Sequence, residues 1–281
     1  LGLLPQRAQI SGSVTLEGRE LVNASRGELE QVRGGRIAMI FQDPSSSLNP
    51  VQRVGKQLDE SLRLHRGLSG ATARAEAIRL LDLVGIPSAK TRIDLYPHEF
   101  SGGQCQRIMI AMALAGEPDL LIADEPTTAL DVTIQAQILD LLATIRHETG
   151  MAMVFISHDL GAVSAVCDRA AVMYAGRVVE QNHIGELFDN PRHPYTVGLF
   201  EAIPELQGPR RRLQPINGTV PNPRHLPRGC AFSPRCAHAS DFCRSAQPAL
   251  LLQPDGGQVA CFHPVRDPRR TFSPASAELA A

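Results

Sequence analysis

Two short motifs constrain this chain more than any other feature. Residues 100–104 read Phe-Ser-Gly-Gly-Gln, and residues 120–125 read Leu-Leu-Ile-Ala-Asp-Glu, an apolar run that ends in two carboxylates. A Ser-Gly-Gly turn that opens a helix offers a phosphate free backbone N–H groups and the positive end of the helix dipole. A strand that ends in Asp and Glu offers one carboxylate to magnesium and a second to water. Together the motifs predict an α/β fold with a nucleotide site at the carboxyl ends of its strands.

Three further segments follow predicted elements in a fixed order. Gln42 follows the predicted strand 36–41, Ala129-Leu130-Asp131 follows the acidic pair, and His158 follows the predicted strand 151–157. Alone, each is an ordinary polar residue in a loop. Together with the first two motifs, their order resembles that of the ATP-binding cassette ATPases, in which they would be the Q-loop, the D-loop and the switch histidine. The resemblance implies a P-loop-type α/β cassette core.

The resemblance assigns roles to four residues, with ATP and Mg²⁺ as the cofactors. Asp124 is expected to hold magnesium, directly or through water, and Glu125 to act as the general base on the attacking water. His158 is expected to contact the γ-phosphate and to orient Glu125. Gln42 is expected to sense the γ-phosphate through magnesium and to move with a membrane partner. The structural alternatives are a pair of solvated acids at a strand end for Asp124 and Glu125, a loop glutamine for Gln42 and a satisfied polar residue for His158.

The Ser-Gly-Gly turn at residues 101–103, the signature turn, is expected to bind nucleotide that another subunit holds. In the family's architecture this turn closes on ATP that is held by a second cassette, so hydrolysis requires a head-to-tail dimer. Asp131 is expected at the seam of that dimer. The residues of the turn that would contact nucleotide are Ser101, Gly102, Gly103 and Gln104.

One motif of the family is not found. The sequence contains no Gly-x-x-x-x-Gly-Lys-Ser/Thr, the loop that wraps the phosphates. Residues 1–5 resemble the end of the helix that follows this loop in relatives, so we expect the sequence to lack an N-terminal part. We then expect the chain to be inactive and to fold poorly alone, because apolar sheet edges would be uncovered. The alternative is a natural, non-catalytic cassette that lends only its signature turn to a partner.

Composition limits the classes of function. The chain has 28 basic and 29 acidic residues, so no overall positive field attracts nucleic acid or an anionic membrane. This argues against a cassette that acts in nucleic-acid repair or translation. No apolar stretch approaches the length that spans a bilayer, and no secretory leader opens the sequence. An intracellular location is favoured because the nucleotide motifs require ATP.

Periodicity predicts the other elements and two domains. The apolar run 151–157 predicts a strand that is covered on both faces. We expect a cassette domain at 1–190, with a helical subdomain at about 51–115, and a proline-rich C-terminal appendage at 191–281. The remaining expected elements are strands at 13–16 and 120–123, helices within 51–96 and at 104–114 and 133–147, and a hairpin of 170–174 with 177–180.

Four of the six cysteines lie in the appendage, and they admit three interpretations. Five, six and seventeen residues separate them, whereas structural zinc usually shows one short Cys-x2-Cys or Cys-x4-Cys pair. Four thiolates match the ligand count of a 4Fe-4S cluster, and residues 230–236 resemble the cluster-bearing tail of oligopeptide importer ATPases. A cluster, a zinc ion with His238 or His263, and no metal all remain open. The four are Cys230, Cys236, Cys243 and Cys261, whereas Cys105 and Cys167 are expected to be packed thiols.

Several segments resemble the importer ATPases for oligopeptides, dipeptides and nickel rather than cassettes in general. The resemblance implies an ATPase subunit on the cytoplasmic face of the plasma membrane that energises peptide import. Its expected partners are a second cassette, two permease subunits and, indirectly, an extracytoplasmic solute-binding protein, with no nucleic acid. Nickel and glutathione remain open as solutes. The segments that carry the resemblance are 41–44, 47–50, 96–99, 123–131, 134–137 and 193–196.

Overall fold

The computed structural model describes residues 1–5, 7–128, 130–203 and 215–265. The chain forms two compact units, Leu1–Ala162 and Val163–Ala281, and each is described by itself. Ala129 of the predicted D-loop lies outside the described residues.

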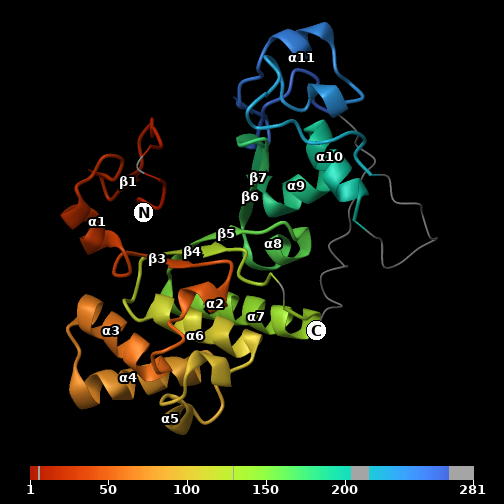
Figure 1. Cartoon of the computed structure of the whole chain (residues 1–281). Coiled ribbons are helices and arrows are strands. Elements are labelled where there is room, and N and C mark those ends of the chain that lie inside the picture. The colour runs from red at the N-terminus through yellow and green to blue at the C-terminus, as the bar shows by residue number, and fades with distance from the viewer. Residues whose placement is uncertain (6, 129, 204–214, 266–281) are drawn as a thin grey trace. The chain divides into compact units, whose positions relative to one another are not determined.

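A parallel sheet organises the first unit. Its strands β3 (Ile37–Ile40), β4 (Leu120–Asp124) and β5 (Ala152–Ile156) lie in the order β3-β4-β5, and both neighbouring pairs are parallel. Helices α6 (Gly102–Leu114) and α7 (Val132–Thr149) lie on one face of this sheet (Figure 1). The three strands therefore end at the same edge, as the predicted α/β fold requires.

The prediction that β5 is covered on both faces is wrong. Along β5 the side chains alternate between exposed and half-buried, and Val154 and Ile156 are 48% and 46% exposed. Met153 and Phe155 point to the other face and pack against the core cluster. Among the described strands β5 pairs only with β4, so it forms an edge of the sheet with one open face. An uninterrupted apolar run does not by itself show that both faces of a strand are covered.

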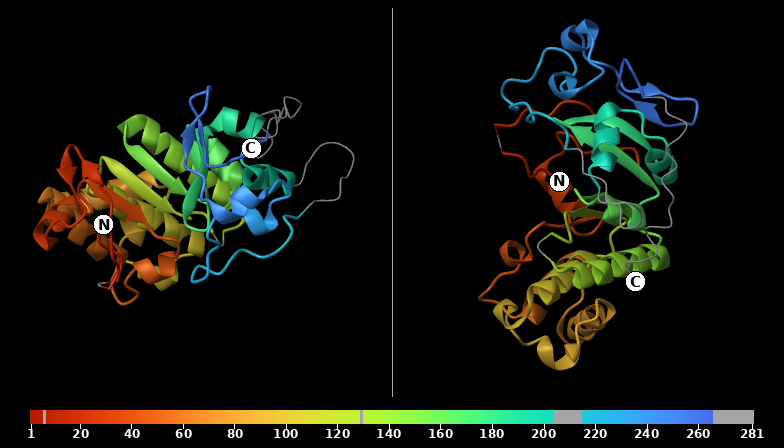
Figure 2. Two further views of the ribbon diagram at one scale, coloured as in Figure 1. Left: turned by 90° about the horizontal axis from the view of Figure 1, so that it is seen from above. Right: turned by 90° about the vertical axis from the view of Figure 1, so that its right-hand side faces the viewer.

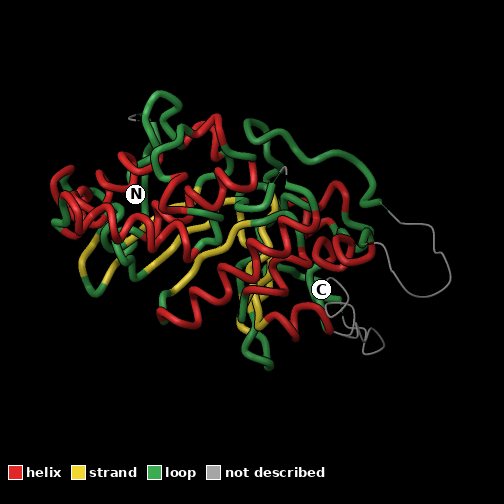
Figure 3. The backbone as a smooth tube through the Cα atoms, turned by 90° about the horizontal axis from the view of Figure 1, so that it is seen from below, coloured by secondary structure: helices red, strands yellow, loops and turns green. Residues whose placement is uncertain are grey.

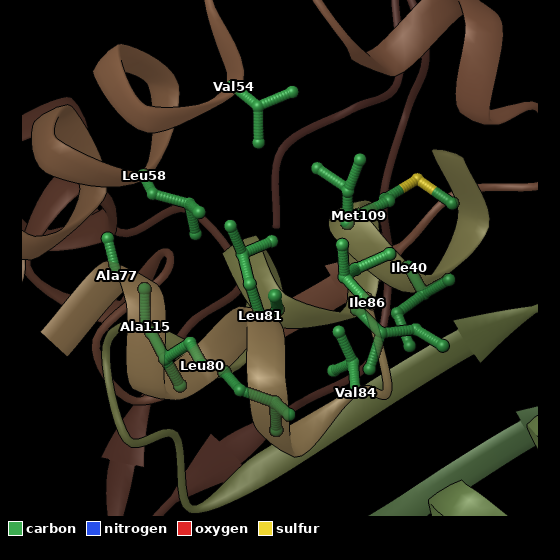
Figure 4. Close-up of a cluster of buried hydrophobic side chains, with 14 of the residues drawn as sticks. Ile40, Val54, Leu58, Ala77, Leu80, Leu81, Val84, Ile86, Met109 and Ala115 are labelled. Carbon is green, nitrogen blue, oxygen red and sulfur yellow. The ribbon is translucent and has the colours of Figure 1, made fainter. Parts of the chain in front are cut away.

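Helices form the predicted insert of the first unit. After the short α2 (Pro44–Ser47) come α3 (Val54–Arg66), α4 (Gly70–Leu83) and α5 (Ala89–Arg92), followed by a 3₁₀ turn at Pro97–Glu99. Apolar side chains from these helices and from α6 form one buried cluster (Figure 4). Members of this cluster that are essentially inaccessible include Val54, Leu58, Ala77, Leu81 and Val84.

The start of the chain contributes a small hairpin and one capped helix. Strands β1 (Thr15–Leu16) and β2 (Arg19–Glu20) pair antiparallel, so the predicted strand 13–16 is shorter than expected. Ser25 caps the N-terminus of helix α1 (Arg26–Val32), where its side chain and that of Glu28 form a reciprocal capping box.

A four-stranded antiparallel sheet organises the second unit, in the order β6-β7-β9-β8. The predicted hairpin is confirmed as β6 (Arg169–Tyr174) and β7 (Arg177–His183), which pair antiparallel. Strand β7 also pairs with β9 (Gln258–Val259), which pairs with β8 (Leu251–Leu252). The sheet thus joins residues from both sides of position 190, where the change in composition had suggested a domain boundary.

Short helices and loops complete the chain. Helix α8 (Leu160–Val166) precedes the hairpin, and α9 (Ile184–Asp189) packs against β7 (Figure 2). Helix α10 (Pro194–Glu201) follows, and residues 215–265 are mostly loop, with a 3₁₀ turn at Ser233–Arg235 and α11 (Asp241–Ser245) (Figure 3). Within the described residues, no helix has the length and apolarity needed to cross a membrane.

Candidate nucleotide site and cysteine-lined cavity

Gln42, Glu125 and His158 converge at one edge of the parallel sheet. Gln42 comes two residues after β3, Glu125 directly after β4, and His158 two residues after β5. Nε2 of Gln42 donates a hydrogen bond to Oε2 of Glu125 over 2.8 Å, and Nδ1 of His158 lies 3.2 Å from Oε1. The side chains of Gln42 and His158 therefore meet at the carboxylate of Glu125.

The backbone and a neighbouring hydroxyl also hold Glu125. Its N–H donates to the carbonyl of Ile156 in β5, and its φ of 46° lies in the left-handed region. Oγ1 of Thr128 donates to Oε2 over 2.9 Å. The hydrogen bonds from Thr128 and His158 hold the pKa of Glu125 below its usual value. The carboxylate is thus ionised near neutral pH, the form in which it can accept a proton.

Asp124 is the last residue of β4, in register with Ile156 of β5, and it is half-buried. The position places its carboxylate next to Glu125 in the sequence and at the same edge of the sheet. Its role as the magnesium ligand remains a prediction.

The Ser-Gly-Gly turn forms the N-terminus of α6. Oγ of Ser101 accepts from the N–H of Gln104, and Oε1 of Gln104 accepts from the N–H of Ser101, so the two form a capping box. A Cβ at Gly103 would lie 2.8 Å from Cγ2 of Ile134, whereas a Cβ at Gly102 would meet nothing within 4 Å. Packing within the chain therefore explains the glycine at 103 but not the glycine at 102.

Asp131 caps helix α7, and the same helix contacts the loop of His158. Oδ1 of Asp131 accepts from the N–H of Ile134 over 2.9 Å. One turn along, Nε2 of Gln135 donates to Oδ2 of Asp159 over 2.7 Å. Residues 134–137 stood out in the sequence only as a family resemblance. The contact between Gln135 and Asp159 was therefore not predicted, and neither was the contact of Thr128 with Glu125.

In the second unit, the four appendage cysteines line one cavity. No disulfide joins the described cysteines. Burial raises the pKa of Cys230 and of Cys236, and it raises that of Cys261 to about 11. Among the described residues, no group of three or more His, Cys, Asp or Glu side chains is arranged to hold a metal ion. The cysteines in the cavity wall are Cys230, Cys236, Cys243 and Cys261.

Three histidines also line this cavity: His193, His238 and His263. His193 precedes the cysteines by more than 30 residues, so spacing within the cysteine motif could not have revealed it. It is 1% exposed and caps α10, where its Nδ1 accepts from the N–H of Tyr195 over 3.0 Å. Burial lowers the pKa of His193 to about 4, which leaves the imidazole neutral.

Two family models match the chain. The "ABC transporter" model matches residues 2–128, and the "Oligopeptide/dipeptide transporter, C-terminal region" model matches residues 179–243. The second match contains part of the antiparallel sheet and three of the four cavity cysteines.

Two relatives are similar to almost the whole of this chain. The oligopeptide transport ATP-binding protein OppD of Salmonella typhimurium is 50% identical over 95% of this chain and 79% of its own length. The dipeptide transport ATP-binding protein DppD of Escherichia coli is 46% identical over 96% of this chain and 83% of its own length.

Among solved structures, the ATP-binding cassette MJ0796, dimeric and bound to ADP and Pi after hydrolysis, matches with a TM-score of 0.56 and 28% identity. The match covers 62% of this chain and 74% of that one. The cassette CbiO1 of Clostridium perfringens, part of a transporter complex, matches with a TM-score of 0.56 and 30% identity over 63% of this chain and 68% of its own. The chain therefore belongs to the ATP-binding cassette family, within the group of oligopeptide and dipeptide transport ATP-binding proteins.

Proposed function

We propose that this chain is the ATP-binding and ATP-hydrolysing subunit that energises the import of dipeptides or oligopeptides through a membrane permease. The observation that carries the proposal is the meeting of Gln42, Glu125 and His158 at the ends of three neighbouring parallel strands. Such an edge is where α/β sheets bind ligands. The names of relatives such as OppD and DppD support a peptide as the solute, rather than nickel or glutathione.

Each of these residues has a different role in the proposed hydrolysis. Glu125, ionised near neutral pH, accepts a proton from the attacking water. Gln42, on the loop after β3, and His158, on the loop after β5, contact its two carboxylate oxygens. Asp124 would hold Mg²⁺, which neutralises phosphate charge as it develops.

We further propose that the signature turn acts in a dimer. Gly102 is exposed and unpacked within its own chain, which suits a backbone that closes on nucleotide in a second cassette. The dimeric state of the MJ0796 cassette supports this arrangement. Asp131 would lie at the dimer seam. Two permease subunits and, indirectly, a solute-binding protein complete the proposed assembly, which places the chain at the cytoplasmic face of the membrane.

The cysteine-lined cavity supports a second proposal, that Cys230, Cys236, Cys243 and Cys261 hold a 4Fe-4S cluster. Their convergence in one cavity and their all-sulfur donor set fit such a group. They do not form the close ligand set that one metal ion requires. Burial raises the pKa of Cys230, Cys236 and Cys261, so binding through their thiolates would release protons.

The test of the ATPase proposal is phosphate release by the assembled importer, with the full-length protein and with its Glu125→Gln variant. The variant keeps the shape of the side chain but removes the proton acceptor, so we expect hydrolysis to fall by about 10²- to 10⁴-fold. Unchanged hydrolysis would instead support the alternative that this chain lends only its signature turn to a catalytic partner.

A further inference from the structure

The two carboxylate oxygens of Glu125 have unequal surroundings. Oε2 accepts two hydrogen bonds, from Nε2 of Gln42 at 2.8 Å and from Oγ1 of Thr128 at 2.9 Å. Oε1 faces Nδ1 of His158 at 3.2 Å. An oxygen that already accepts two hydrogen bonds is a poorer proton acceptor than its neighbour, because the donors stabilise its negative charge. The geometry thus distinguishes the two oxygens.

The two donors to Oε2 are attached to the site in different ways. Gln42 lies 83 residues from Glu125, on the loop that follows another strand. Thr128 lies only three residues away, and its N–H donates to the carbonyl of Glu125 over 3.2 Å. Glu125 and Thr128 therefore belong to one turn, in which Pro126 restricts the backbone and Thr127 is 7% exposed.

This difference matters when the loops move. The side chain of His158 is 74% exposed, whereas that of Glu125 is 25% exposed. A carboxylate rotates easily about its last bond, so without a fixed partner its two oxygens exchange places. Gln42 and His158 reach Glu125 from loops that follow other strands, whereas the hydroxyl of Thr128 belongs to the same turn as the carboxylate.

We propose that Thr128 is a positioning residue for the general base: its hydroxyl fixes Oε2 of Glu125 so that Oε1 is the atom that takes the proton. The inference rests on the proposed ATPase function. In that step, water transfers one proton to Oε1 while its oxygen bonds to the γ-phosphorus of ATP. The bond from that phosphorus to the bridging oxygen breaks, and ADP leaves with the electron pair.

The experiment compares Thr128→Val and Thr128→Ser in the assembled importer. Valine keeps the branched shape of threonine and removes the hydroxyl, whereas serine keeps the hydroxyl. We expect Thr128→Val to lower kcat on the order of tenfold, as for a lost hydrogen bond to a charged group, with an unchanged KM for ATP. Thr128→Ser should restore kcat.

Thr72→Val is the matched control. The hydroxyl of Thr72 also donates to a residue three positions earlier, the carbonyl of Ser69, but it lies in the helical insert. Its kcat and its KM for ATP should equal those of the parent. If Thr128→Val keeps the parent's kcat, or if Thr128→Ser loses activity to the same extent, the positioning role is wrong. If Glu125→Gln hydrolyses ATP as fast as the parent, the proposed ATPase function itself fails, which is a separate result.

Discussion

Nε2 of Gln42 lies within hydrogen-bonding distance, 2.8 Å, of Oε2 of Glu125, although the residues are 83 positions apart in the chain. The contact exists because β3 and β4 are parallel neighbours, so the loops after them begin at the same edge of the sheet. It links the loop of Gln42, which is expected to respond to the permease, directly to the proposed base.

Gln42→Leu should therefore weaken both hydrolysis and its coupling to transport. The substitution removes the donor to Oε2, and we expect kcat to fall on the order of tenfold. Phosphate release with and without transported peptide measures the effect. A variant that hydrolyses as fast as the parent, and is stimulated to the same degree by peptide, would contradict the prediction.

Gly102→Ala separates folding from function in the signature turn. A Cβ at residue 102 meets nothing within 4 Å, so the melting temperature should not fall. Hydrolysis should nevertheless drop if this backbone closes on nucleotide in another subunit, because a methyl group would then stand against the phosphates. Gly103→Ala is the contrast, since its Cβ would lie 2.8 Å from Ile134 and should lower the melting temperature. Full activity of Gly102→Ala in the importer would rule out the proposed contact.

Cys236→Ser tests the proposed cluster. Removing one of four ligands should abolish stoichiometric iron and inorganic sulfide in anaerobically purified protein, together with the visible absorbance of a cluster. Cys105→Ser is the control, because Cys105 lies in the first unit, where its thiol donates to the carbonyl of Pro97 over 3.4 Å. Equal iron content in the two variants would exclude Cys236 as a ligand.

Glu180 should make the second unit less stable as pH rises. It is 3% exposed, and burial raises its pKa above the ordinary value of 4.5. Between these two pKa values the folded state binds more protons than the unfolded state, so the free energy of unfolding falls with rising pH and then levels off. Urea unfolding at a series of pH values measures this slope.

Glu180→Gln should remove that pH dependence, since an amide does not titrate. It should also lower stability at neutral pH, because the two carboxylate oxygens accept from the backbone N–H groups of Arg192 and His193. The exposed Glu186 in α9 offers the control Glu186→Gln, which should leave the parent's slope intact. An identical slope in Glu180→Gln and the parent would show that another group controls it.

The sequence alone determined the local elements and the order of the polar residues that follow them. Apolar runs predicted β3, β4 and β5. Because the chain is continuous, Gln42, Glu125 and His158 must lie one or two residues beyond the ends of these strands. The hairpin of β6 and β7 was predictable for the same reason, because short-range periodicity and a turn with Gly176 specify it.

Which segments distant in sequence meet could be seen only in the folded chain. It left one face of β5 open, paired β7 with β9 across residue 190, and placed His193 in the wall of the cysteine-lined cavity. It also showed that Gly103 packs against Ile134 while Gly102 does not. The physical reason is that a residue's chain neighbours set its backbone preference, whereas its burial and its hydrogen-bond partners depend on elements that reach it only when the whole chain has folded.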